Sequence, residues 1–159
     1  MELFLFRHAE AEPRSAETPD ERRTLTVKGR ERFLRGAECL QRLEVELDRV
    51  YHSPWLRSIE SAELLTLLLD GETVVTPLLA QPPTRELLDL FEGERVAVVG
   101  HEPWLTQLIA WLVTGAPERA PNFELKKGAM ARLHGEARFG AMTLGQLLTP
   151  KVLTRLGRR

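Results

Sequence analysis

The chain has 159 residues, with 22 Lys and Arg against 23 Asp and Glu and a formal net charge of -1. This length is enough to bury one hydrophobic core, so we expect a single domain over residues 1–159. The balanced charge excludes a strong overall field toward nucleic acid or an anionic membrane, and we expect neither as a partner.

Cys39 is the one cysteine, so no internal disulfide can form. The start of the sequence lacks the basic segment, long apolar stretch and small-residue cleavage site of a secretory signal. Apolar stretches such as residues 62–69 are too short to cross a membrane. These features predict a soluble, cytoplasmic protein.

Short β-rich runs alternate with longer helical patterns along the chain, which is typical of an α/β layer fold. The expected strands are residues 1–6, 49–52, 73–76, 95–99, 130–134 and 138–143, with the last two forming a hairpin. The expected helices run from the Thr26 cap to about Leu43, from the Ser53 cap and Pro54 to about Leu69, over residues 84–91, from near Pro103, and from the Thr149 cap and Pro150. Val27, Leu34, Ala37, Leu40 and Leu43 are expected as the apolar stripe of the helix that begins after Thr26, with Cys39 packed near it.

Arg7 and His8 directly follow the first apolar run. In an open α/β sheet, ligands bind in the crevice outside the carboxyl ends of the strands. An arginine beside an imidazole suits a phosphoryl group there. By itself, however, such a dipeptide is more often a surface salt-bridge partner.

Two further polar residues occupy similar places, since Arg57 lies early in the second expected helix and His101 follows the fourth expected strand. If these strands are parallel neighbours, the four side chains overhang one crevice. Two guanidiniums and two imidazoles, with the starts of two helices, predict an anion pocket whose natural ligand is phosphate.

The chemistry of this set favours phosphoryl transfer. A neutral imidazole nitrogen of His8 can attack phosphorus and form a phosphohistidine. Arg7 and Arg57 disfavour a second positive charge on that ring and neutralise the equatorial oxygens of the phosphoryl group. His101 is expected to donate a hydrogen bond to the same oxygens.

Four blocks of the sequence resemble the signature blocks of the histidine phosphatase superfamily, the phosphoglycerate mutase-like family. They are Leu5–Ala11, Leu25–Gly29, Ser53–Ser58 and Val98–Pro103. The resemblance implies a three-layer α/β/α sandwich with a mostly parallel central sheet, and it implies that no metal and no cofactor is required. It further implies that His8 is the phosphorylated nucleophile and that Arg7, Arg57 and His101 complete the phosphate pocket.

Within that superfamily, the compact size and the Arg7–Ala11 block are most similar to the SixA-type phosphohistidine phosphatases, which act on phosphorylated histidine in signalling proteins. The large helical cap insert of the mutases is missing, since only residues 77–93 stand in its place. A shallow, open site would admit a protein side chain. Ala9 departs from the usual Arg-His-Gly block and is tolerable if its φ is negative.

The general acid is not fixed by the sequence. Many members of the family use a carboxylate from the segment before the fourth strand, and Glu86 is the candidate there. Glu10, two residues after His8, is the other candidate. A solvated carboxylate explains either residue equally well. Phosphohistidine has a better leaving group than an alkyl phosphate, so an absent acid favours that substrate.

Other chemistries find little support. The position six places after Cys39 is Val45, which excludes a cysteine phosphatase loop, and neither a phosphate-binding Walker loop nor a Gly-x-Ser-x-Gly elbow occurs. His52 and His134 are interpreted as strand-end or surface residues because the histidines lack the short spacing of metal ligands. The Lys126–Lys127 pair and the Arg158–Arg159 end are interpreted as solvated charge in preference to a docking surface for an acidic protein.

Three hypotheses follow. The first is a metal-independent phosphatase that removes phosphate from phosphohistidine in a signalling protein of the histidine phosphotransfer type. The second is a small-molecule phosphomonoesterase of the same superfamily acting on a small phosphorylated substrate. The third is a non-catalytic phosphate-binding module.

Overall fold

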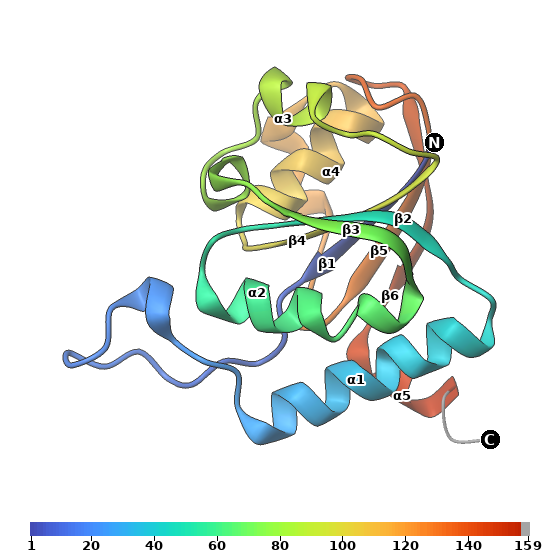
Figure 1. The fold of residues 1–159 in the computed structure, drawn as a ribbon. Coiled ribbons are helices and arrows are strands. Elements are labelled where there is room, and N and C mark those ends of the chain that lie inside the picture. Colours follow the sequence, from blue (N-terminus) through green and yellow to red (C-terminus); the bar gives the residue numbers. More distant parts are fainter. Residues whose placement is uncertain (157–159) are drawn as a thin grey trace.

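The computed structural model describes residues 1–156 and contains a central sheet of six strands (Figure 1). The strands are β1 (Glu2–Arg7), β2 (Leu47–His52), β3 (Leu69–Val75), β4 (Arg95–Gly100), β5 (Met130–Gly135) and β6 (Met142–Leu148). Their order across the sheet is β3-β2-β4-β1-β5-β6. The four strands from β3 to β1 run parallel, and β5 and β6 are antiparallel to their neighbours. The prediction of a mostly parallel sheet ending in a hairpin is confirmed.

Helices cover both faces of this sheet (Figure 1). The α-helices are α1 (Val27–Arg42), α2 (Leu56–Glu63), α3 (Arg85–Asp89), α4 (Trp104–Thr114) and α5 (Pro150–Leu156). Short 3-10 helices are η1 (Asp20–Arg22), η2 (Thr66–Leu68), η3 (Pro77–Ala80) and η4 (Pro117–Asn122). Helices α1, α2 and α5 lie on one face, and α3 and α4 lie on the other. The expected three-layer α/β/α sandwich is therefore present.

Side chains alternate between the two faces of the sheet along each strand, which produces two hydrophobic cores, one on each face. In β1, Leu3 and Leu5 point into the core beneath α3 and α4, whereas Phe4 and Phe6 point into the core beneath α1, α2 and α5. Successive side chains of a strand point to opposite faces, so a strand buried on both sides is apolar throughout. This explains why β1 reads as a continuous apolar run.

The helix boundaries differ from the prediction at two points. Helix α2 begins at Leu56 and not at Pro54, because the Ser53 side chain accepts a hydrogen bond from the Trp55 amide and also contacts a histidine. Helix α2 ends at Glu63, and η2 follows it. Thr26 caps α1 as expected, its hydroxyl accepting from the Gly29 amide at 2.9 Å.

The apolar stripe predicted for α1 is partly wrong. Val27 and Leu43, at its two ends, are 76% and 60% exposed. The buried positions of the helix include Phe33, Ala37 and Leu40, with Cys39 also buried. The helix packs through its middle, so residues at its ends remain in solvent.

Strand β6 was expected over residues 138–143 and lies at Met142–Leu148. A turn occupies the first expected positions, residues 138–141, with the Ala141 amide donating to the Arg138 carbonyl, and only residues 142 and 143 of the expected range lie in the strand. Gly140 within this turn has a φ of 68°, a conformation that favours glycine. Over residues 1–156, no helix is long and apolar enough to cross a membrane.

Candidate active site

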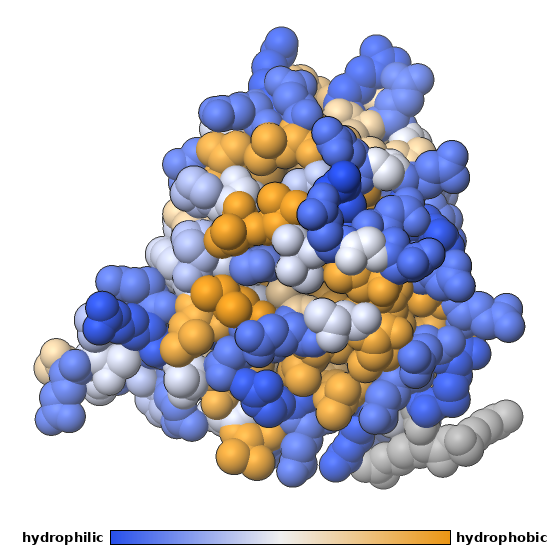
Figure 2. All heavy atoms as spheres, viewed as in Figure 1, coloured by the Kyte–Doolittle hydropathy of each residue, from blue (hydrophilic) through white to orange (hydrophobic). Residues whose placement is uncertain are grey.

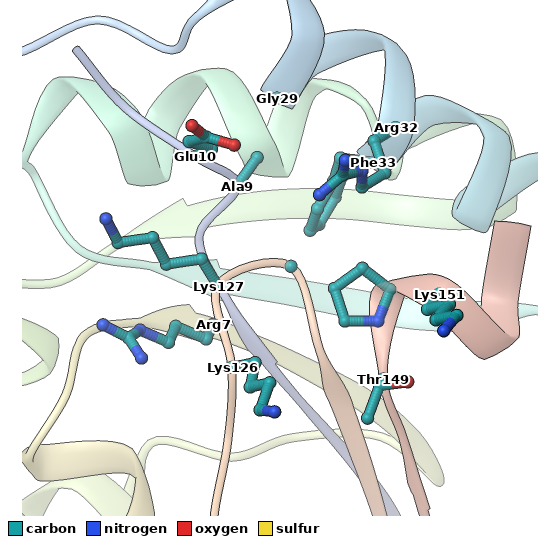
Figure 3. A pocket seen from close by; sticks show the side chains of 12 residues that line it. Arg7, Ala9, Glu10, Gly29, Arg32, Phe33, Lys126, Lys127, Thr149 and Lys151 are labelled. Atoms are coloured by element: carbon teal, nitrogen blue, oxygen red, sulfur yellow. The ribbon is translucent and has the colours of Figure 1, made fainter.

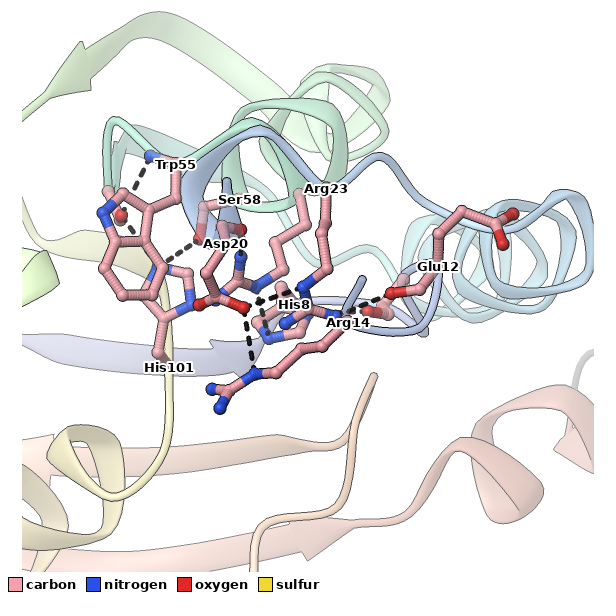
Figure 4. Close-up of polar contacts among 11 residues, drawn as sticks. His8, Glu12, Arg14, Asp20, Arg23, Trp55, Ser58 and His101 are labelled. Carbon is pink, nitrogen blue, oxygen red and sulfur yellow. Dashed lines mark hydrogen bonds and ion pairs between the residues drawn. The ribbon is translucent and has the colours of Figure 1, made fainter. Parts of the chain in front are cut away.

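Two histidines meet where the central strands end. His8 follows β1 and His101 follows β4, and these strands pair in parallel with Arg7 opposite Gly100. The two rings are both buried, and their centroids lie 5.1 Å apart. The predicted convergence of strand ends is thus observed (Figure 4).

Arg57 joins the pair from the first turn of α2. Its Nε donates to His8 Nε2 at 3.2 Å, and its side chain is 3% exposed. Its guanidinium carbon also lies 4.6 Å from the centroid of the Trp55 ring. Arg57 is therefore held firmly against the outer edge of the His8 ring.

The His8 ring has a fixed orientation. Its Nδ1 lies 2.6 Å from the Ala9 carbonyl oxygen, which can only accept a hydrogen bond, so Nδ1 carries the hydrogen and donates. This arrangement leaves the lone pair on Nε2. Burial, assisted by the positive charges of Arg57, Arg7 and Lys127, lowers the pKa of His8 to about 3. The φ of Ala9 is not positive, as its methyl group requires.

The His101 ring is held from the opposite side. Its Nε2 lies 2.8 Å from Ser53 Oγ and 3.4 Å from Ser58 Oγ. Its Nδ1 is buried and has no hydrogen-bond partner among residues 1–156. Burial lowers the pKa of His101 to about 3, and the nearby His8 and Arg57 act in the same direction. Both rings are consequently neutral near pH 7.

Arg7 has one nitrogen fixed and another free of partners. Its Nη1 donates to the Leu125 carbonyl at 3.0 Å, while Nε is buried without a partner in the described part of the chain. Burial lowers the pKa of Arg7, and the carboxylate of Glu102 opposes this effect. An anion would satisfy both Arg7 Nε and His101 Nδ1 if the latter carries its proton.

Glu102 is a half-buried carboxyl group directly after His101. Its Oε2 accepts from Thr106 Oγ1 at 2.5 Å, and its Oε1 has no partner within residues 1–156. Burial raises the pKa of this carboxyl group. The sequence analysis overlooked Glu102, although its position next to His101 was a usable signal.

Asp20, on η1, places a negative charge beside Arg57. Its Oδ2 lies 3.1 Å from Arg57 Nη2, and its Oδ1 lies 3.1 Å from Arg14 and 2.8 Å from Arg23 (Figure 4). Burial opposes ionisation, but the hydrogen bond from Arg23 and the charges of the arginines prevail and lower the pKa of Asp20. Nothing in the sequence around Asp20 indicates this long-range contact with α2.

The two carboxylates expected as general acids lie outside this cluster. Glu86 is exposed on α3, and Glu10 is exposed on the segment after β1. Neither is hydrogen-bonded to His8, His101, Arg7 or Arg57. The remaining histidines fit their interpretation, since His52 ends β2 and His134 is an exposed residue of β5. No group of three potential metal ligands occurs in the described residues.

Fold and site together define an α/β protein with a cluster of two buried histidines and two arginines at the carboxyl ends of parallel strands. The family model of the histidine phosphatase superfamily (branch 1) matches residues 3–81. An uncharacterized protein of Picosynechococcus sp. is 30% identical over 156 residues, which is 92% of this chain and 93% of that protein. The chain belongs to the histidine phosphatase superfamily.

Solved structures share the fold over most of the chain. The protein histidine phosphatase SixA complexed with tungstate superimposes with a TM-score of 0.77 and 27% identity, covering 95% of this chain and 98% of that one. The alpha-ribazole phosphatase from Shigella flexneri gives a TM-score of 0.71 and 20% identity, covering 94% and 97%. These similarities agree with the phosphoglycerate mutase-like fold expected from the sequence.

Proposed function

We propose that the protein is a metal-independent phosphatase that acts as a single domain and removes phosphate from phosphohistidine in a signalling protein. The observation that carries this proposal is the state of the His8 ring. Its Nδ1 is held by the Ala9 carbonyl, and its Nε2 lies 3.2 Å from Arg57 Nε in a buried site. Such a ring is a neutral nucleophile beside a phosphate-binding cation.

In the first step, the lone pair of His8 Nε2 attacks phosphorus, and the bond from phosphorus to the substrate nitrogen breaks. The substrate ring carries a proton on its other nitrogen, so it leaves with the electron pair of the broken bond as a neutral imidazole. Arg57 Nε turns from His8 Nε2 to a phosphoryl oxygen. Arg7 and Arg57 balance the charge of the oxygens throughout the transfer.

In the second step, the oxygen of a water molecule attacks phosphorus, and the bond from phosphorus to His8 Nε2 breaks. Inorganic phosphate leaves, and the proton lost by the water passes to solvent. His8 regains its lone pair. Ser53 Oγ accepts from the Trp55 amide, and its own proton is available to His101 Nε2. In that tautomer His101 Nδ1 carries a hydrogen and donates it to a phosphoryl oxygen.

A protein substrate is supported by the open surroundings of the site. Between β3 and β4 the chain forms only η3 (Pro77–Ala80) and α3 (Arg85–Asp89), which leaves no long helical roof. A structural neighbour with 27% identity is described as a protein histidine phosphatase. Glu86 and Glu10 are not needed as acids in this scheme, because the protonated imidazole is a good leaving group.

The test compares a phosphohistidine protein with aryl and sugar phosphates as substrates, with and without EDTA. We expect turnover of the phosphohistidine protein, unaffected by EDTA, through an acid-labile phosphoenzyme that the His8→Ala protein does not form. The exposed His134→Ala protein is the matched control and should behave like wild type. Preference for sugar phosphates would favour the small-molecule alternative, and phosphate binding without any turnover would favour a binding module.

A further inference from the structure

A basic hollow of about 450 Å³ lies at the end of β1, where Arg7 and Ala9 belong to its lining (Figure 3). Its lining holds five cationic side chains and one carboxylate, that of Glu10. The cations are Arg7, Arg32, Lys126, Lys127 and Lys151. Phe33 and Pro150 contribute apolar surface. Four separate chain segments therefore converge to place like charges around one depression.

The hollow lies next to His8 along the chain. Arg7 and Ala9, the chain neighbours of His8, belong to its lining, although His8 itself does not. The charge of Lys127 acts on His8 and contributes to its lowered pKa. The cations of the hollow therefore lie close to a ligand that is bound at His8.

The loop that carries Lys126 and Lys127 is fixed to the end of β1. The Gly128 amide lies 3.1 Å from the Arg7 carbonyl and 3.0 Å from the His8 carbonyl, and donates to both. Gly128 adopts a φ of 73°, which favours glycine at this position. The chain thus holds these lysines beside the nucleophile by backbone contacts.

Most cationic side chains of the hollow have no ion-pair partner in the described part of the chain. Arg32, Lys127 and Lys151 have no ion-pair partner among residues 1–156, and Lys126 has only an exposed partner, Glu124, at 3.6 Å. Unpaired like charges around a depression repel one another and attract an anionic partner. The interpretation of the Lys126–Lys127 pair as solvated charge does not explain this arrangement. Arg158 and Arg159, which are interpreted in the same way, lie outside the described residues.

We infer that this basic hollow recognises acidic side chains that flank the phosphorylated histidine of a protein substrate. The inference rests on the proposed function and names the kind of surface that the substrate presents. Small-molecule sites are mostly apolar and enclose their ligand, whereas this hollow is rimmed by exposed, flexible lysines. Such a rim suits carboxylates on a protein surface, where charge complementarity governs association.

The experiment uses two histidine peptides phosphorylated on the ring, one flanked by aspartates and the other by asparagines. The hollow variant is Arg32→Gln/Lys126→Gln/Lys151→Gln, which leaves Lys127 in place because its charge acts on His8. The control variant, Lys28→Gln/Arg35→Gln/Arg138→Gln, removes the same charge from outside the hollow. Aryl phosphate hydrolysis reports the basal activity of each protein.

We expect wild type to prefer the aspartate-flanked peptide, and the hollow variant to lose about tenfold in kcat/KM for that peptide alone. The control variant should retain the preference, and added salt should weaken it in wild type. Equal use of both peptides by wild type, or an equal loss in the control variant, would overturn the inference while leaving the proposed function intact.

If neither phosphorylated peptide is hydrolysed, the proposed function fails, and the hollow is tested separately. The unphosphorylated aspartate-flanked peptide should then inhibit aryl phosphate hydrolysis by wild type and not by the hollow variant. Absence of such inhibition overturns the inference. Inhibition by a sugar bisphosphate that depends on the hollow, without inhibition by the peptide, overturns it in favour of a small polyanion.

Discussion

At the scale of single residues, the two histidines of the site differ in which nitrogen is engaged. The Ala9 carbonyl holds Nδ1 of His8, whereas Ser53 holds Nε2 of His101. A neutral imidazole has one donor and one acceptor nitrogen, so the Ala9 carbonyl, which only accepts, selects the tautomer of His8, and the Ser53 hydroxyl selects that of His101 when it donates to Nε2. In our proposal this makes one ring a nucleophile and the other a hydrogen-bond donor.

Ser53→Ala tests this assignment, since Ser53 acts through His101 as a positioning residue. We expect kcat/KM to fall by roughly 10- to 100-fold, in the range of losses seen when an orienting partner of a functional histidine is removed. Nitrogen NMR of the imidazoles should show that His101 loses its single tautomer while His8 keeps its own. Ser53→Thr, which retains the hydroxyl, should recover much of the activity. An unchanged His101 spectrum in Ser53→Ala would contradict the assignment.

At the scale of elements, the segment between β1 and α1 supplies an internal anion to the site. Residues 12–19 are exposed, and Figure 2 shows that the projecting segment is covered mainly by hydrophilic residues. Asp20 then returns to bind Arg57, whose Nη1 also donates to the Asp20 carbonyl at 2.6 Å. A phosphoryl group that approaches Arg57 must compete with this carboxylate.

Asp20→Asn should therefore strengthen the binding of oxyanions. We expect the inhibition constant of tungstate or inorganic phosphate to fall by about fivefold, because a partly exposed carboxylate–arginine pair contributes on the order of 1 kcal/mol. Competitive inhibition of aryl phosphate hydrolysis measures this constant. Glu17→Gln, in the exposed part of the same segment, is the control and should leave it unchanged. Weaker oxyanion binding in Asp20→Asn would show that the carboxylate positions Arg57 and does not compete with the ligand.

The elements also show how much of the structure could be predicted from the sequence. Strands β1 and β4 were predictable because both contain continuous apolar runs, with β-branched valines in β4, as is typical of strands buried on both faces. The start of α2 was misplaced because the polar contacts of Ser53 depend on His101, which lies far along the chain. Asp20 was missed for the same reason, since only a tertiary contact brings it to Arg57, whereas Glu102 could have been found from its position next to His101. Arg7, His8, Arg57 and His101 were found because each follows a strand end or opens a helix.

At the scale of the whole molecule, the two buried histidines of the site lower the free energy of unfolding at acidic pH. His8 and His101 are buried and neutral, with pKa values of about 3 in the folded state against 6.5 for the free side chain. Between these values the unfolded chain binds more protons than the folded one, so the free energy of unfolding falls as the pH decreases. Glu102, whose pKa is raised by burial, acts in the opposite direction.

We expect each of these two histidines to remove roughly 1.4 kcal/mol of stability per pH unit below about 6.5. Urea unfolding at several pH values between 6.5 and 4.5 measures this slope. The His101→Gln protein should show about half the wild-type slope, because one of the two buried rings is gone. The exposed His134→Gln protein should keep the wild-type slope, and a slope unchanged by His101→Gln would refute the explanation.

Strand β1, which ends at Arg7 directly before His8, lies at the centre of the sheet, between β4 and β5. Glu2 pairs with Arg95 on one side and with His134 on the other. During synthesis, β1 therefore leaves the ribosome long before either of its partners has been made. Its apolar side chains stay exposed to solvent, or covered by a chaperone, until β4 and β5 have been translated and can pair with it. The residue on which the proposed chemistry depends is made early and reaches its final environment late.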